Sequence, residues 1–265
     1  MMPVLFSWGP FHLYSFGLMV ALGLGLTFYL VTPWARKTGF PHPNKAADLV
    51  LVTVISGFLG ARLYYGLQYL SVYLENPLAI FAVWEGGLIF YGGVLGSLLG
   101  LWIFSRLKSL SFLEALDFLI PFVAGVHGFG RIGCFLNGCC GGRACDLPWA
   151  VRFPPEEVAV HPTQLYEAVF NFALFFFLLN RYSHRTFKGQ IIAFYFLFYA
   201  VGRFVIEFFR VHEIQWAGLS SNQWVSLVIF GGGIFFYVYA RSSANGGTTK
   251  QSKRPPESHP RPDQG

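Results

Sequence analysis

The chain has 265 residues, of which 54% are hydrophobic and 12% are charged. This charged fraction is about half of the roughly 25% that is usual in soluble domains, which excludes an ordinary soluble enzyme. The net charge of +6 does not indicate a nucleic-acid partner, because the basic residues form no cluster interleaved with aromatic residues.

Seven apolar stretches are each long enough to cross the hydrocarbon core of a bilayer as a helix. They cover approximately residues 11–33, 47–70, 87–105, 111–130, 164–180, 189–209 and 223–240. The first stretch has neither a positive segment before it nor a cleavage site after it, so we interpret it as a retained anchor. We therefore predict an all-α polytopic membrane protein with about seven transmembrane helices.

Lysine and arginine concentrate in alternate connections between these stretches. The first 35 residues contain neither, and the three alternate connections hold Arg36, Lys37, Lys45, Arg106, Lys108, Arg181, Arg185 and Lys188. Because short cytoplasmic loops carry the excess of Lys and Arg, this alternation predicts an outside N-terminus and a cytoplasmic C-terminus. Arg143 and Arg152 break the pattern, since their connection is predicted to lie outside.

The last 24 residues differ from the rest of the chain. Residues 242–265 are polar, rich in proline and devoid of large apolar side chains. Such a segment cannot bury enough apolar surface to fold. We predict one transmembrane domain over residues 1–241 and a disordered, basic cytoplasmic tail over residues 242–265.

Several ionisable residues fall within or at the ends of the apolar stretches, where each costs roughly 2.5–3.5 kcal/mol to insert. They include Arg62, Glu85, Asp117, Arg131, Glu167, Arg203, Glu207 and Arg210. Structural ion pairing explains some of them, and Arg203 and Glu207 have the i, i+4 spacing of an intrahelical pair. Arg62, Arg131 and Arg203 exceed what pairing requires, and guanidinium is the preferred partner of phosphate. The pattern predicts a phospholipid headgroup site in the outer leaflet.

Seven motifs, in order, resemble one family over about residues 10 to 240. They are FGLM at 16–19, GARLYY at 60–65, WEGGLIFYGGVLG at 84–96, GRIGCFLNG at 130–138, HPTQLYEA at 161–168, GRFVIEFFR at 202–210 and NQWVSL at 222–227. Together they resemble the bacterial prolipoprotein diacylglyceryl transferase family.

The resemblance implies a multi-pass enzyme of the bacterial inner membrane, with its active site toward the periplasm and no cofactor. It would transfer diacylglycerol from phosphatidylglycerol to the lipobox cysteine thiol in the signal peptide of a prolipoprotein. The products would be a thioether and glycerol phosphate. Two alternatives stay open: a related membrane enzyme with another lipid acceptor, and a non-catalytic membrane protein that binds anionic lipid or handles thiols.

The resemblance also implies roles for particular residues. Arg131 would hold the phosphatidylglycerol headgroup, and Arg203 with Glu207 would form an essential catalytic pair. The remaining predicted lipid-binding residues are Gly130, Asn137, Arg62, Tyr166, Glu167, His161 and Gln164. No metal site is implied.

The chain departs from the family pattern where a histidine is usual, because Tyr91 stands there. With a pKa near 10, tyrosine is a poor base at neutral pH. We therefore keep Tyr91 as a candidate catalytic residue and add His127 as the nearest histidine that could replace the base. A hydrogen-bonded histidine at a helix end is an equally good interpretation of His127.

A second departure is a group of cysteines, with Cys134 and Cys139 at positions where the family has asparagine and glutamate. Together with Cys140 and Cys145 they form a C-x4-C-C-x4-C pattern, predicted to lie outside, where disulfides persist. A bridge between neighbours 139 and 140 would be strained, which leaves 134–139 with 140–145, or the crossed set. Free thiols used as small apolar residues, zinc binding and thiol chemistry in catalysis are the alternatives.

Overall fold

The computed structural model describes residues 3–8, 11–82, 86–154, 158–211 and 216–251. Within these residues the chain forms long helices α1 (Ser15–Lys37), α2 (Ala46–Gln68), α4 (Phe90–Leu107), α5 (Phe112–Asn137), α6 (Thr163–Tyr182), α7 (Gln190–Glu207) and α8 (Ser221–Gln251). The shorter elements are the strands β1 (Val4–Trp8), β2 (Phe11–Tyr14), β3 (Val151–Arg152) and β4 (Ala159–Val160), the helix α3 (Leu70–Glu75) and two 3-10 turns, Pro43–Lys45 and Pro77–Phe81.

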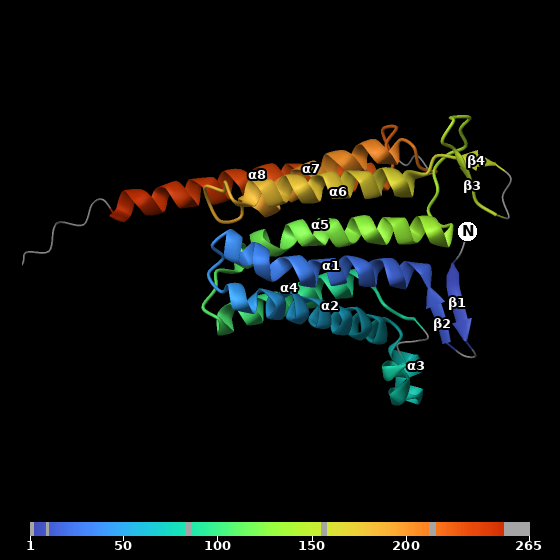
Figure 1. Cartoon of the computed structure of the whole chain (residues 1–265), viewed down its shortest axis with the longest axis horizontal. Coiled ribbons are helices and arrows are strands. Elements are labelled where there is room, and N and C mark those ends of the chain that lie inside the picture. Colours follow the sequence, from blue (N-terminus) through green and yellow to red (C-terminus); the bar gives the residue numbers. More distant parts are fainter. Residues whose placement is uncertain (1–2, 9–10, 83–85, 155–157, 212–215, 252–265) are drawn as a thin grey trace, which may run out of the picture.

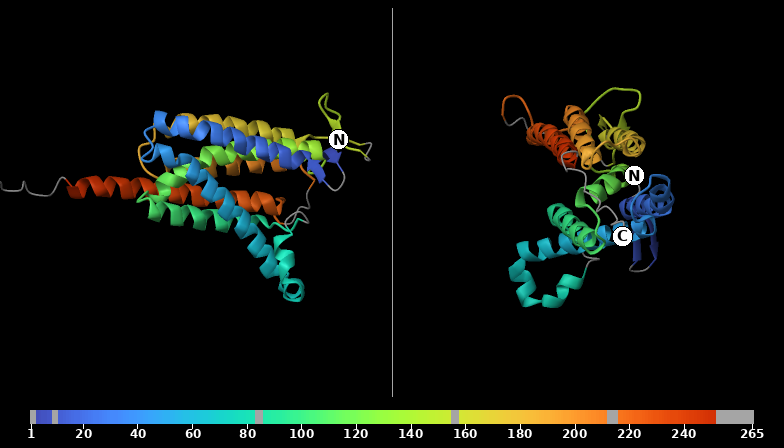
Figure 2. Two further views of the ribbon diagram at one scale, coloured as in Figure 1. Left: turned by 60° about the horizontal axis from the view of Figure 1, so that its bottom comes forward. Right: turned by 90° about the vertical axis from the view of Figure 1, so that its left-hand side faces the viewer.

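Helix α5 is the centre of the arrangement. It lies between a group formed by α1, α2 and α4 and a second group formed by α6, α7 and α8 (Figures 1 and 2). It packs against helices of both groups, most extensively α1 and α6. The connections rich in Lys and Arg, which join α1 to α2, α4 to α5 and α6 to α7, lie together at the left-hand end in Figure 1.

The long helices have the composition of membrane spans. Within the described residues, six are long and apolar enough to cross a bilayer: α1, α2 with the turn before it, α4, α5, α7 and α8. Large apolar side chains stay exposed on them, such as Phe235 and Val228, each 73% exposed. Such a surface suits lipid contact. In a bilayer, apolar side chains face the lipid and the backbone N–H and C=O groups form hydrogen bonds within the helices. The protein is an all-α polytopic membrane protein.

The predicted fifth span corresponds to α6, which is outside this set of six. Its 20 residues include the buried Gln164, Glu167 and Asn171, which lower its hydropathy. It nevertheless runs alongside α5 and α7 (Figure 1). A seventh span therefore stays a prediction, and α6 is a helix whose polar stripe faces the interior of the bundle.

Glycines bring α2 and α4 into close backbone contact. A Cβ atom on Gly60 would collide with the carbonyl oxygen of Gly92, and one on Gly96 with that of Ser56. Small residues allow helices to approach closely where the lipid supplies no hydrophobic drive for their association. The rest of the core is aromatic and aliphatic, and the ring centroid of Phe118 lies 4.0 Å from that of Phe40.

Three element boundaries differ from the predicted ones. The first helix begins at Ser15 rather than at 11, because residues 11–14 pair with β1 in a hairpin of aromatic and branched residues. Helix α5 continues past residue 130 to Asn137, because its glycines pack against other helices, Gly133 against Phe16 for example. Helix α8 continues past residue 241 through Gln251. Residues 252–265, the rest of the predicted tail, lie outside the described residues.

Candidate active site

Three arginines and two glutamates meet at one end of α5, α6 and α7. Arg131 of α5 and Arg203 of α7 both form ion pairs with Glu167 of α6. Arg203 Nη2 also lies 3.0 Å from Glu207 Oε2, one turn further along α7. Arg210, just beyond α7, lies 3.6 Å from Glu167 Oε1 and 3.8 Å from Glu207 Oε2. We call these five residues the arginine cluster.

The cluster is shielded from solvent but not sealed. The carboxylates of Glu167 and Glu207 are 4% and 1% exposed, whereas the side chains of Arg131, Arg203 and Arg210 are 16–19% exposed. Each arginine therefore contacts a buried carboxylate on one side and exposes part of its surface on the other. Within these five described residues, three cations against two anions leave one positive charge in excess.

Several polar atoms of the cluster lack hydrogen-bond partners. Among the described residues, Arg210 Nη1, Glu167 Oε2 and Glu207 Oε2 are buried without a hydrogen bond of regular geometry, although all three belong to ion pairs. Buried polar groups in folded proteins are nearly always hydrogen-bonded. A guanidinium N–H without a hydrogen bond, beside an excess positive charge, suits an anionic ligand, because such a ligand supplies the missing hydrogen-bond acceptor.

The start of α8 holds the second glutamate in place. Asn222 Nδ2 donates to Glu207 Oε1 over 2.8 Å, and the Ser220 hydroxyl donates to the same oxygen over 3.3 Å. The side-chain oxygen of Gln223 accepts the backbone N–H of Ser220 over 2.9 Å. These contacts fix Glu207 and, through it, the orientation of Arg203.

His127 lies beside the arginine cluster and contacts Arg131. Arg131 Nε donates to His127 Nε2 over 3.3 Å, one helical turn away on α5. This bond requires the neutral tautomer with its proton on Nδ1, because a protonated Nε2 could not accept. The His127 ring also packs near Tyr199, with 5.7 Å between the ring centroids. In this arrangement the Nε2 lone pair is used to orient Arg131.

Three predicted residues at the start of α6 form a second group beside the cluster. His161 Nδ1 lies 3.2 Å from the Tyr166 hydroxyl, which also accepts a hydrogen bond from Trp149 Nε1 over 2.8 Å. Gln164 is fully buried, and its amide nitrogen donates to the carbonyl oxygen of Cys139. The segment after α5 is thereby attached to the first turn of α6, the turn before Glu167.

The glycine-rich signature itself is the end of a helix. Arg131 and Gly130 lie within α5, and a Cβ built on Gly130 meets nothing within 4 Å. Asn137 is the exposed last residue of the helix, and Gly138 ends it in the left-handed conformation, with φ of 77°. Beyond it, Gly142 forms an antiparallel bridge with Arg210, which places that arginine beside the signature.

Two predicted residues lie elsewhere. Arg62 is buried on α2, where its guanidinium donates to the carbonyl oxygens of Ile80, Ala82, Gly86 and Gly87. These bonds pin the segment before α4 to α2, which is a structural use of the charge. The structure therefore does not bring Arg62 into the arginine cluster.

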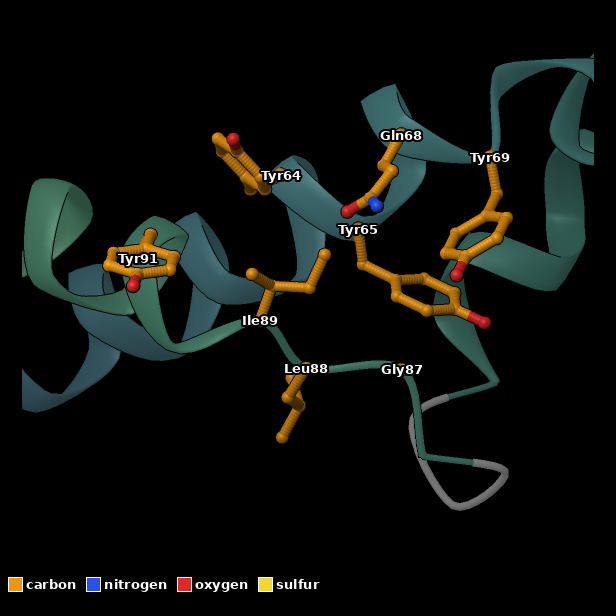
Figure 3. Close-up of a pocket in the computed structure, with 8 residues that line it drawn as sticks. All are labelled: Tyr64, Tyr65, Gln68, Tyr69, Gly87, Leu88, Ile89 and Tyr91. Atoms are coloured by element: carbon orange, nitrogen blue, oxygen red, sulfur yellow. The ribbon is translucent and has the colours of Figure 1, made fainter. Parts of the chain in front are cut away.

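Tyr91 likewise lies outside the arginine cluster. It stands on the first turn of α4 and is 71% exposed, at the edge of a pocket of about 630 Å³ (Figure 3). The pocket is lined by Tyr64, Tyr65, Gln68, Tyr69, Gly87, Leu88, Ile89 and Tyr91. Four tyrosines around one opening suit an amphipathic ligand at a membrane surface, because each ring has an apolar face and a polar tip. A catalytic role for Tyr91 stays a prediction.

The four cysteines carry free thiols. Neither predicted disulfide pairing is present in the structure. Cys134 lies in the last turn of α5, whereas Cys139 and Cys140 follow Gly138, the residue that ends the helix.

Sequence reasoning assigned no role to Arg210, Ser220, Asn222 and Trp149. Arg210 had a usable signal, since it follows Glu207 by three residues in the motif GRFVIEFFR. Asn222 also had a signal, since it is the first residue of the motif NQWVSL. Ser220 and Trp149 had none, because only the fold brings them to Glu207 and Tyr166.

A sequence profile described as prolipoprotein diacylglyceryl transferase matches residues 3–239. The chain belongs to this family. A phosphatidylglycerol–prolipoprotein diacylglyceryl transferase of Methylococcus capsulatus is 34% identical over 91% of this chain and 97% of its own length. Proteins of the same name from Clostridium tetani and Pasteurella multocida are 35% and 38% identical, over 89% and 85% of this chain and 97% and 84% of their own lengths.

The fold brings together motifs that lie far apart in the chain. Arg131 of the signature and Arg203 of the GRFVIEFFR motif are 72 residues apart in the chain, and Glu167 from a third motif joins them. In this member of the prolipoprotein diacylglyceryl transferase family, three recognised motifs thus contribute to one ionic network.

Proposed function

We propose that this chain transfers diacylglycerol from phosphatidylglycerol to the lipobox cysteine thiol in the signal peptide of prolipoproteins. The relatives are named for these two substrates. The observation that carries the proposal is the arginine cluster, with its excess positive charge and its buried Arg210 Nη1, which is ion-paired with Glu167 but makes no hydrogen bond. A phosphodiester headgroup supplies the missing negative charge and the missing acceptors.

The reaction needs charge stabilisation at the leaving group. The thiolate attacks the carbon of the diacylglyceryl unit that carries the phosphate ester. A C–S bond forms there while the bond from that carbon to the phosphate oxygen breaks. Glycerol phosphate leaves with the electron pair, and the thiol proton is lost to a base. Preorganised guanidinium groups stabilise charge that develops on the phosphate, and the same positive potential favours the thiolate over the thiol.

We assign Arg131 and Arg203 to the headgroup phosphate, because both keep part of their surface exposed above Glu167. Glu207 orients Arg203, and His127 orients Arg131. Gly130 leaves open space where lipid can approach the backbone. Asn137, His161 and Tyr166 surround the same end of α5 and α6, and we assign them to the rim of the lipid site. Gln164 is buried beneath them and supports the site by holding the carbonyl oxygen of Cys139.

We further propose that the cluster faces the periplasm in the bacterial inner membrane. It lies at the end of the bundle opposite the connections rich in Lys and Arg (Figure 1). Since such connections stay in the cytoplasm, the cluster would open to the outer leaflet. Lipid tails and an apolar signal helix could then reach it from the side, between exposed apolar helix faces.

The test is complementation of a bacterial strain depleted of its own transferase, combined with transfer in vitro. The purified chain is mixed with phosphatidylglycerol vesicles and a peptide that carries a lipobox cysteine. Growth with slow-migrating lipoprotein, together with a peptide mass increased by one diacylglyceryl group, is the expected result. Lipid binding without any transfer would overturn the proposal in favour of a lipid-binding protein, and transfer to another acceptor would point to the related enzyme.

A further inference from the structure

Three of the four thiols converge at the C-terminal end of α5. The Sγ atoms of Cys134, Cys139 and Cys140 all lie within 4.8 Å of one another, and those of Cys139 and Cys140 are 3.5 Å apart. A metal ion bound by thiolates at about 2.3 Å requires its sulfur ligands to be roughly 3.7–4 Å apart. Small side-chain rotations therefore suffice to give three ligands to one ion.

The backbone is held in an unusual conformation at this point. Cys140 has a φ of 68°, in the left-handed region that few residues other than glycine adopt. It follows Cys139 directly, and neighbouring side chains in an extended chain point to opposite sides. The left-handed conformation costs about 1 kcal/mol, and it accompanies the convergence of the two adjacent thiols.

Contacts from α6 support this conformation. Thr163 Oγ1 donates to the carbonyl oxygen of Cys140 over 3.1 Å, and Gln164 donates to that of Cys139. The backbone N–H of Cys139 in turn donates to the carbonyl oxygen of Cys134 over 3.2 Å. The three cysteines are thus part of a fixed junction between two helices.

The electrostatic environment suits an anionic metal–thiolate complex. The guanidinium charges of Arg210 and Arg131 lie close enough to act on the Cys140 thiol. Three thiolates with one monovalent or divalent cation carry net negative charge, and nearby positive charge favours such a complex.

We propose that Cys134, Cys139 and Cys140 bind one thiophilic cation, Cu⁺ or Zn²⁺. Thiolates prefer such soft or borderline ions, whereas Mg²⁺ and Ca²⁺ prefer oxygen ligands. Each thiol loses a proton on binding, and no electron is transferred. Cys145 lies outside the group of converging thiols. The site differs from the predicted disulfides and does not depend on the proposed transferase activity.

A bound cation would strengthen the junction between α5 and α6. The carbonyl groups of Cys139 and Cys140 hold Gln164 and Thr163, and Glu167 follows Gln164 by three residues on α6. The ion would therefore stabilise the part of the fold that carries the shared carboxylate of the arginine cluster.

The first experiment measures metal affinity in the reduced full-length protein in detergent, without oxygen. Cu⁺ is titrated against a chromophoric Cu⁺ chelator and Zn²⁺ against a zinc indicator, with Mg²⁺ as the negative control. One equivalent of Cu⁺ or Zn²⁺ should bind. Cys139→Ser should weaken binding at least about 10-fold, whereas the matched variant Cys145→Ser should bind within about 3-fold of the unaltered protein. Equal loss in both variants, or no stoichiometric binding, would overturn the proposal.

The second experiment needs no substitution and so does not depend on how the variants fold. The unaltered protein is alkylated with a maleimide, with and without the metal, and each cysteine is quantified by mass spectrometry. Metal should protect the three converging cysteines at least about 10-fold and leave Cys145 unchanged, and a chelator should remove the protection. Equal labelling of all four cysteines with metal present, or protection removed only by a reductant, would contradict the metal site, the latter in favour of a disulfide.

Discussion

Helices α5, α6 and α7 carry or contact buried ionisable groups at both ends, and the two ends use them differently. At the end with the Lys- and Arg-rich connections, Asp117 accepts the backbone N–H groups of Gly189, Ile191 and Ile192 over 2.7–3.0 Å. About 21 Å further along α5, Arg131 is the first residue of the arginine cluster.

The hydrogen bonds of the two ends explain the difference. Asp117 is fully buried, and its three bonds cap the positive start of α7. The five residues of the arginine cluster instead have one positive charge in excess, and a buried donor on Arg210 makes an ion pair but no hydrogen bond. A buried charge whose partners are complete stabilises the fold, whereas a buried charge in excess is available to a ligand. The comparison orders the following predictions.

The largest loss of activity is expected for Arg131→Lys, which keeps the charge but removes the bidentate fork. Transfer from phosphatidylglycerol should fall by about 100- to 1000-fold, the usual effect of losing a preorganised donor to a developing anion. The control is Arg185→Lys at the opposite end, where Arg185 lies 3.4 Å from Glu114. That variant should keep its activity within about 3-fold. Near-normal transfer by the Arg131 variant would show that this arginine does not hold the phosphate.

The exchange of Arg203 and Glu207 separates pairing from catalysis. The double variant Arg203→Glu with Glu207→Arg keeps one charge of each sign at the i, i+4 positions, but moves the cation one turn away from Glu167. We expect transfer to fall at least about 100-fold, with the protein still inserted in the membrane. The measurement is product formation per folded molecule. Substantial activity in the exchanged protein would reduce both residues to a structural pair.

Asp117→Ala should affect stability and leave chemistry intact. The substitution removes the carboxylate that accepts hydrogen bonds from three buried backbone N–H groups. This loss costs about 3 kcal/mol of folding free energy. The midpoint of thermal unfolding in detergent should fall, while transfer per folded molecule below that midpoint changes less than about 3-fold. A selective loss of transfer at unchanged stability would mean that this end of α5 also acts in the reaction.

The smallest effect is expected for Tyr91→Phe. The side chain is 71% exposed and lies at the pocket on α2 rather than among the arginines. Loss of its hydroxyl should change the transfer rate by less than about 3-fold, because a solvent-accessible hydroxyl contributes little. The rate is compared with that of Tyr64→Phe, a second tyrosine of the same pocket. A loss of 100-fold confined to Tyr91→Phe would restore its predicted catalytic role.

Composition and local spacing by themselves determined much of this protein. Apolar stretches of about 20 residues predict spanning helices, because a bilayer requires backbone groups to be satisfied within the helix. The alternation of Lys and Arg predicts which helix ends belong together, and Arg203 with Glu207 follows from the helical repeat. Each of these features is local in the chain, so the amino-acid sequence contains it directly.

Only the tertiary structure decided which charges meet. It brought Arg131, Arg210 and Arg203 to Glu167, kept Arg62 on backbone carbonyls and gathered three of four cysteines. These outcomes depend on how helices pack, and packing here is set by contacts between distant residues, such as Gly133 against Phe16. A hydropathy pattern tells which residues are in the membrane, whereas the rotation of each helix about its axis determines which side chains converge.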